Sequence, residues 1–207
     1  MKSKSTLLIS GVVVVFLVVF IFFLFNDEKK ITNYPSTGTD IIAFGDSLVE
    51  GAGSTIGNDF VLLLSKKIGR AMIKLGVSGN TTEDGLKRIS EFDKYKPKIV
   101  LLLLGGNDHL KKVPIDETFS NLGKIIENIQ SRGAIVLLLG VKGNLLGDKF
   151  KSKFEDISDK YHTAYVENVL DGLFADSRYM SDAIHPNDLG YARIAEKIYP
   201  VLEKLVN

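Results

Sequence analysis

Ser47, Asp182 and His185 have the side-chain types and the spacing needed for nucleophilic acyl transfer. A serine hydroxyl attacks a carbonyl only after a base removes its proton, and histidine suits this role because its pKa lies near neutrality. Asp182 stands three residues before His185. On a loop or in a first helical turn, that spacing lets the carboxylate reach the imidazole Nδ1 and fix its tautomer. We therefore predict Ser47 as the nucleophile, His185 as the base and Asp182 as its orienting acid.

The other two of the chain's three histidines are weaker candidates for the base. His109 lies close to a predicted strand end but has no carboxylate at a comparable spacing. His162 lies at the end of a predicted helix, far from any strand-end segment, and we assign it an ordinary surface role. Taken alone, Asp182 and His185 are also compatible with an aspartate that only caps a turn.

Three groups are candidates to stabilise the oxyanion that forms during acyl transfer. They are the backbone N–H of Ser47, the backbone N–H of Gly79 and the side-chain amide of Asn107. Glycine lets a backbone N–H approach a ligand without an intervening side chain, and asparagine offers a neutral donor. Each such donor contributes roughly 10²–10³ in rate. Glycine and asparagine are also ordinary turn residues, so their significance depends on the fold around them.

From residue 40 onward, short apolar runs alternate with segments of helical periodicity. This alternation is typical of parallel βαβ units and predicts an α/β fold, a three-layer α/β/α sandwich. Ligands of such sheets bind at the carboxyl ends of the strands, which is where the segments with Ser47, Gly79 and Asn107 fall. The predicted strands are residues 41–44, 71–75, 99–104, 134–139 and 163–166, and the predicted helices are residues 59–68, 81–92, 115–130, 149–161 and 189–205, the last with a kink at Pro200.

Four short segments together resemble the SGNH hydrolases, also called GDSL esterases/lipases. In chain order they are residues 44–48 (FGDSL), 77–81 (VSGNT), 105–108 (GGND) and 182–187 (DAIHPN). The resemblance covers about residues 40–207, and four blocks in the right order are far more specific than any one of them. The residues that name the family would be Ser47, Gly79, Asn107 and His185.

This resemblance implies a flavodoxin-like parallel sheet with strand order 2-1-3-4-5. It also implies hydrolysis of esters or thioesters through an acyl-serine, with no metal and no cofactor. Gly79 and Asn107 would serve with Ser47 as oxyanion donors, and Asp182 would orient the base. The likeness is strongest to the bacterial thioesterase I, lysophospholipase and arylesterase branch, in which the loop at residues 141–148 would shape the acyl pocket.

Residues 7–25 form an apolar run of nineteen residues with no charge between Lys4 and Asp27. As a helix the run would span roughly 28 Å, close to the thickness of a bilayer's hydrocarbon core. A cleaved signal peptide is the alternative, but its apolar region is shorter and ends at small residues. Because Lys2 and Lys4 precede the run, we expect an uncleaved membrane anchor with the rest of the chain exported.

Composition and further motifs argue against other kinds of site. A formal net charge of +1 without a basic stripe argues against a nucleic-acid partner, and the absence of cysteine excludes thiolate chemistry. The glycine run at residues 51–57 (GAGSTIG) looks like a dinucleotide fingerprint but has Ile56 where a glycine should stand. Asp46 and Asp108 lie near the predicted carboxyl ends of the strands. We expect them to form structural hydrogen bonds rather than to bind a metal.

These observations favour a tethered serine esterase that acts on a small-molecule or lipid ester, of the lysophospholipase, thioesterase or arylesterase kind. The alternative is a carbohydrate O-acetyl esterase acting on cell-wall or extracellular polysaccharide, which fits export equally well. A non-catalytic binding module is disfavoured because inactive relatives normally lose the serine or the histidine. The expected organisation is an anchor with its flanks at residues 1–30, a linker at residues 31–39 and the hydrolase domain at residues 40–207.

Overall fold

The computed structural model of the chain describes residues 30–141 and 147–207, of which Ile31–Asn207 form one compact unit. The predicted anchor at residues 7–25 and most of the predicted pocket loop, residues 142–146, lie outside the described residues. Within the described part of the chain, no helix is both long enough and apolar enough to cross a membrane.

Five parallel strands form the central sheet in the order β2-β1-β3-β4-β5, which confirms the predicted order and the predicted α/β class. Gly45, at the end of β1, pairs with Gly76 on one side and Leu103 on the other, so three strands end at nearly the same level. The strands are β1 (Asp40–Gly45), β2 (Met72–Gly76), β3 (Pro97–Leu103), β4 (Ile135–Leu139) and β5 (Ala164–Val166).

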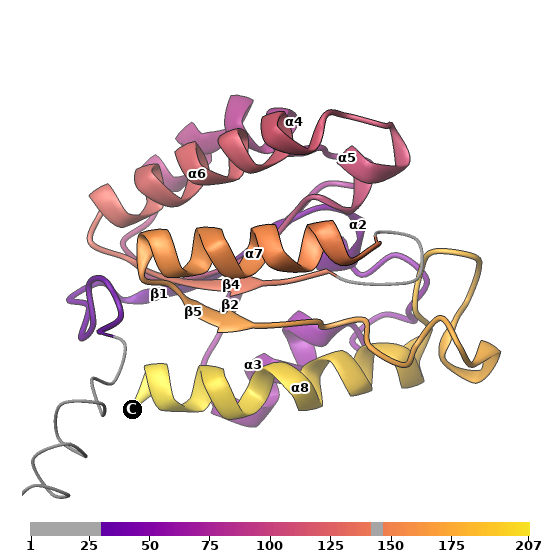
Figure 1. Cartoon of the computed structure of the whole chain (residues 1–207). Coiled ribbons are helices and arrows are strands. Elements are labelled where there is room, and N and C mark those ends of the chain that lie inside the picture. The colour runs from indigo at the N-terminus through magenta and orange to yellow at the C-terminus, as the bar shows by residue number, and fades with distance from the viewer. Residues whose placement is uncertain (1–29, 142–146) are drawn as a thin grey trace, which may run out of the picture. The chain divides into compact units, whose positions relative to one another are not determined.

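Helices cover both faces of the sheet and make the three layers (Figure 1). Because the inner strands are covered on both sides, β4 consists only of buried apolar residues, and β3 has one half-buried residue in seven. The helices are α3 (Phe60–Ile68) and α8 (Asp188–Val206) on one face, and α4 (Thr82–Lys87), α6 (Ile115–Ser131) and α7 (Gly147–Tyr161) on the other.

The helix predicted over residues 81–92 is interrupted at Arg88, which corrects that boundary. Helix α4 ends at Lys87, and a separate 3₁₀ helix, η1, covers Ile89–Lys94. The Arg88 guanidinium donates hydrogen bonds to strand-end carbonyls, to Gly45 at 2.7 Å and to Leu75 at 3.1 Å. These bonds hold the Arg88 side chain against the ends of β1 and β2. The Arg88 backbone has φ −105° and ψ 18°, so the α-helix does not continue through it. By contrast, α8 continues through Pro200 as one helix.

Residues 31–39, predicted as a linker, are hydrogen-bonded to the domain. The side-chain amide of Asn33 donates to the carbonyl oxygens of Gln130 at 2.8 Å and Ala134 at 2.9 Å. Both acceptors stand just before β4, at the amino ends of the strands. The chain therefore enters the domain at the amino ends of the strands. The segments that contain Ser47, Gly79 and Asn107 lie at the opposite, carboxyl ends.

Candidate active site

Ser47 is the first residue of a four-residue helix, α2 (Ser47–Glu50), that begins directly after β1. The Asp46 side chain caps this helix by accepting a hydrogen bond from the Leu48 N–H at 3.0 Å. Gly45 allows α2 and β3 to lie close to the end of β1, because a Cβ there would lie 2.2 Å from the Leu103 carbonyl oxygen and 2.6 Å from Val49 Cγ2. This arrangement places the Ser47 hydroxyl at the carboxyl edge of the sheet.

Ser47, His185 and Asp182 form a continuous hydrogen-bonded line, although the serine and the histidine are 138 residues apart in the sequence. The His185 Nε2 lies 3.1 Å from the Ser47 Oγ, and its Nδ1 lies 2.8 Å from Asp182 Oδ2. These distances are within hydrogen-bond reach for proton transfer. The structure thus brings together the three residues that the sequence nominated.

The loop that carries His185 is fixed by local hydrogen bonds. Asp182 Oδ1 accepts from the backbone N–H groups of Ile184 and His185, both at 2.8 Å, while its Oδ2 faces the imidazole. The His185 hydrogen bond, followed by the backbone bonds, lowers the pKa of Asp182 to about 2. The carboxylate is therefore ionised at every mildly acidic or neutral pH. Its negative charge is available to stabilise an imidazolium.

The three predicted oxyanion donors follow the carboxyl ends of three neighbouring strands, β1, β2 and β3. Ser47 presents its N–H at the first position of α2, where no intrahelical partner exists. Gly79 occupies a turn with φ +78°, a conformation that favours glycine. The Asn107 amide is on α5 (Gly106–Leu110) and donates to the Asn80 carbonyl at 3.0 Å. The same amide also donates to Asp46 Oδ2 at 3.4 Å, which is the longer and weaker of its two hydrogen bonds.

Three charged side chains that the sequence did not nominate hold the Gly79 turn in place. Glu50, on α2, accepts hydrogen bonds from both the N–H and the hydroxyl of Ser78. Lys111 donates to the Gly79 carbonyl oxygen at 2.8 Å, and Arg88 donates to the Asn80 side chain at 2.7 Å. No motif marks these residues, because their roles depend on the fold, which brings Glu50 and Lys111 to the turn from about 30 residues away.

The buried carboxylates Asp46 and Asp108 both accept hydrogen bonds. Asp108 is fully buried and accepts from the Thr82 N–H at 2.9 Å and the Thr82 hydroxyl at 2.5 Å, which ties α5 to α4. Asp46 is 4% exposed, and burial raises its pKa to about 7. Among the described residues, no three His, Cys, Asp or Glu side chains are grouped so that they could hold a metal ion.

Replacing Asp46 with asparagine is expected to make the stability of the domain less dependent on pH. Because the folded-state pKa of Asp46 is raised from 3.8 to about 7, the folded protein retains a proton that the unfolded chain has lost. Its stability therefore falls as pH rises from about 4 to about 7. The neutral Asp46→Asn side chain should remove a penalty on the order of 4 kcal/mol at pH 8 and little at pH 4. Urea unfolding at both pH values measures this difference.

The control for this measurement is Asp116→Asn, which neutralises a carboxylate whose side chain is 84% exposed. It should change stability by similar small amounts at both pH values. A constant difference between Asp46→Asn and the unmodified protein across this range would contradict the raised pKa.

A pocket of about 70 Å³ opens beside Ser47 and His185. His109 belongs to the lining, with its ring edge-on to Phe150 at a centroid distance of 5.5 Å, and it makes no hydrogen bond to Ser47 in the described structure. Val141 is the described part of the predicted pocket loop that reaches the lining. The apolar lining residues are Leu48, Leu110, Val141, Leu170, Phe174 and Ile184.

His162 lies away from this pocket and has φ +50°. Its backbone carbonyl accepts a hydrogen bond from the Thr32 N–H at 2.9 Å. The His162 side chain is exposed, as expected for a residue with an ordinary surface role.

Known proteins with similar sequences are hydrolases of esters and thioesters. The family model of the GDSL-like Lipase/Acylhydrolase family matches residues 43–193. The chain is 28% identical over 178 residues to "Esterase TesA" of Pseudomonas aeruginosa, covering 80% of this chain and 89% of that protein. It is 25% identical over 176 residues to "Thioesterase 1/protease 1/lysophospholipase L1" of Escherichia coli, covering 81% of this chain and 85% of that one.

Solved structures give the same assignment. The crystal structure of TesA aligns with a TM-score of 0.76 at 27% identity, covering 81% of this chain and 99% of that one. The SGNH-hydrolase family esterase AlinE4 aligns with a TM-score of 0.64 at 30% identity, covering 83% of this chain and all of that one. With the matched family model covering most of the chain, this protein belongs to the GDSL-like lipase/acylhydrolase family, the SGNH hydrolases, and is a serine hydrolase that acts on esters.

Proposed function

We propose that Ser47, His185 and Asp182 are the catalytic triad and that hydrolysis passes through an acyl-serine. The His185 Nε2 takes the proton of the Ser47 hydroxyl as the oxygen attacks the carbonyl carbon of the ester. His185 then gives that proton to the departing alcohol or thiol, which leaves the acyl group on Ser47. Water, deprotonated by His185, attacks the acyl-serine, and His185 returns the proton to the Ser47 oxygen as the acid departs. The observation that carries this proposal is the unbroken line from Ser47 Oγ to Asp182 Oδ2.

The oxyanion of the tetrahedral intermediate would bind the N–H groups of Ser47 and Gly79 and the amide of Asn107. The Ser47 N–H has no intrahelical partner at the start of α2, and the substrate oxygen would replace the long hydrogen bond, at 3.4 Å, from Asn107 to Asp46. These donors are fixed before substrate arrives, because Glu50 and Lys111 already hold the Gly79 turn. Preorganised donors of this kind lower the barrier without a cost of reorganisation during the reaction.

We further propose that the substrate carries an apolar acyl chain of short to medium length, as in the lysophospholipase, thioesterase and arylesterase activities. The support is the largely apolar pocket next to Ser47. A water-sized group needs roughly 10–15 Å³ of such volume, so a pocket of about 70 Å³ accepts several methylenes. An acetyl group would leave most of this apolar lining without a partner.

The test is a series of p-nitrophenyl esters from acetyl to dodecanoyl, hydrolysed by the full chain in detergent. Each buried methylene contributes about 0.8 kcal/mol, so kcat/KM should rise roughly fourfold per methylene until the pocket is full. Phe174→Ala removes part of the apolar lining without changing a triad residue, and it should flatten this rise while leaving the acetyl ester rate nearly unchanged. A maximum at the acetyl ester would instead support the carbohydrate O-acetyl esterase.

We also propose that residues 7–25 anchor the chain in a membrane, with the catalytic domain on the extracytoplasmic side. The support is the uncharged apolar run, broken only by Ser10 and Gly11, with Lys2 and Lys4 before it. The described chain enters the domain at the edge opposite to Ser47, so this entry point does not cover the active site. Release of the full chain from isolated membranes by alkaline carbonate would contradict the anchor.

A further inference from the structure

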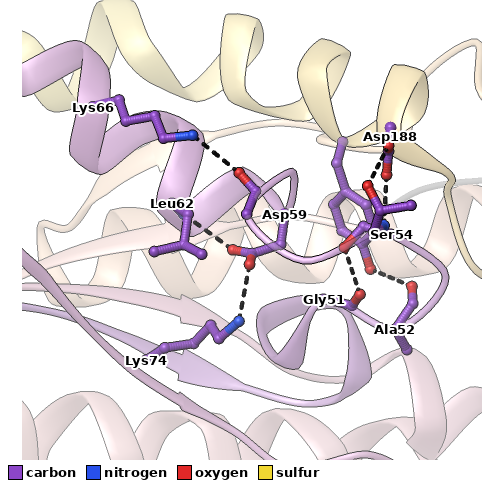
Figure 2. Close-up of polar contacts among 11 residues, drawn as sticks. Gly51, Ala52, Ser54, Asp59, Leu62, Lys66, Lys74 and Asp188 are labelled. Carbon is purple, nitrogen blue, oxygen red and sulfur yellow. Dashed lines mark hydrogen bonds and ion pairs between the residues drawn. The ribbon is translucent and has the colours of Figure 1, made fainter.

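The segment at residues 51–55 lies between the helix that carries Ser47 and the start of α8, which follows His185 (Figure 2). It begins the glycine run that looked like a nucleotide fingerprint in the sequence. At its start, the N–H groups of Gly51 and Ala52 both donate to the Ser47 carbonyl oxygen, at 2.9 and 3.0 Å. The segment is thus bonded directly to the nucleophile's own backbone.

Gly53 brings this segment against the loop that carries His185. A Cβ on Gly53 would lie 2.2 Å from the Ser181 Oγ, 2.6 Å from the Pro186 carbonyl oxygen and 3.1 Å from the His185 Cβ. Its φ of +90° is also a conformation that favours glycine. The backbone at Gly53 therefore occupies the space directly behind His185, and only a residue without a side chain fits there.

Asp188, the first residue of α8, clasps the far end of the segment (Figure 2). Its Oδ1 accepts from the Thr55 N–H and its Oδ2 from the Thr55 hydroxyl, both at 2.7 Å, and Asn58 adds a third bond at 3.1 Å. Tyr191, one turn further along α8 and fully buried, donates its hydroxyl to the Ala52 carbonyl oxygen at 2.8 Å. Two side chains of α8 thus grip the segment on either side of Gly53.

Beyond the segment, Asp59 fixes the chain to the rest of the domain. Its side chain caps α3 through the Leu62 N–H at 3.0 Å and pairs with Lys74 of β2 at 2.9 Å (Figure 2). Asp59 is 3% exposed, so this ion pair is shielded from water on the carboxylate side. The segment is therefore held at both ends and cannot move away from the His185 loop without breaking these bonds.

We propose that residues 51–55, clasped by Asp188, are the positioning element that sets His185 against Ser47, with Gly53 as the point of contact. This inference rests on the proposed triad. Ser47 and His185 are 138 residues apart in the sequence and share no local turn. The 3.1 Å distance between Ser47 Oγ and His185 Nε2 must therefore be set by packing between other parts of the chain. The 51–55 segment is bonded to the backbone of one partner and packs behind the other, so it can fix their separation.

The test compares Gly53→Ala with Gly57→Ala in the full chain. Both glycines have φ +90°, so alanine imposes the same backbone strain at each, but a Cβ on Gly57 meets nothing within 4 Å. Gly53→Ala should lower kcat by about 10²-fold with little change in KM, because a displacement of about 1 Å at the reacting groups has that effect. Gly57→Ala should keep kcat within about twofold, whatever it does to the melting temperature.

Histidine NMR separates positioning from general damage, because the chain has only three histidines. In Gly53→Ala the imidazole signals of His185 should shift while those of His109 and His162 stay in place. Equal losses of kcat in the two alanine variants, or unchanged kcat and His185 signals in Gly53→Ala, would overturn the proposal.

Asp188→Ala gives a second route in case Gly53→Ala does not fold. Asp188 is half-buried, and its replacement by alanine removes the hydrogen bonds to Thr55 and Asn58. It should lower kcat about tenfold with unchanged KM. Asp188→Asn should restore most of the rate. Wild-type kcat in Asp188→Ala would also overturn the proposal. Labelling of the unmodified protein by a fluorophosphonate probe is measured alongside, since failure to label Ser47 would contradict the triad itself and not the positioning role.

Discussion

Replacing Ser47 with alanine is expected to lower kcat for a p-nitrophenyl ester by about 10⁶-fold. The substitution removes the hydroxyl that contacts the His185 imidazole, at 3.1 Å, and leaves the base without a proton to take. Alanine is compatible with the first position of α2, so the domain should retain its fold and its melting temperature. The measurement is the steady-state rate of the purified full chain, together with labelling by a fluorophosphonate probe, which should be lost.

Ser65→Ala is the matched control for this loss. Ser65 lies on α3, and its hydroxyl donates to the Arg70 carbonyl oxygen, at 2.8 Å. Removing it should leave both the rate and the labelling unchanged. Equal turnover by Ser47→Ala and the unmodified protein would show that ester hydrolysis occurs elsewhere or by another nucleophile.

Regularities that the sequence carries locally were sufficient to predict the five strands, whereas their order came from the family resemblance. Residues 99–104 are continuously apolar because β3 is covered on both faces, and the structure places β3 within two residues of that range. The short helices α2 and α5 were missed because four or five residues are too few to show helical periodicity. They matter for the site, because they carry Ser47 and Asn107 at their starts.

Contacts between distant segments explain what the sequence could not supply. Arg88 lies where the predicted helix is interrupted, and its guanidinium binds the carbonyl oxygens of Gly45 and Leu75. The sequence of the helix contains no signal that predicts these bonds. The glycine run at residues 51–57 shows the same limit, because its spacing resembles that of a phosphate-binding turn. In the fold, Gly53 is required by the Ser181 and Pro186 atoms that face it from a distant part of the chain.

Replacing Asp182 with asparagine is expected to lower kcat by roughly 10²–10⁴-fold. The amide introduced by Asp182→Asn would still cap the loop through its oxygen, but its NH₂ group could face the imidazole. An amide donor at that position favours the tautomer in which Nδ1 accepts, so Nε2 would carry the hydrogen and could not take the Ser47 proton. Because the Asp182 side chain is 53% exposed, water screens part of its charge, and the loss should fall in the lower half of this range.

Asp176→Asn decides whether this loss reflects charge and tautomer or only the capping of a turn. Asp176 also accepts a backbone N–H two residues ahead, from Arg178 at 3.0 Å, but its carboxylate faces Arg178 rather than a histidine. If turn capping were the whole role of Asp182, the two variants would lose similar, small amounts of activity. A large loss in Asp182→Asn alone, with melting temperatures of the two variants within a few degrees, would assign the effect to the imidazole. The two aspartates differ in the 2.8 Å contact between Asp182 Oδ2 and His185 Nδ1, which Asp176 lacks. A difference in activity between the two variants therefore measures the importance of this contact.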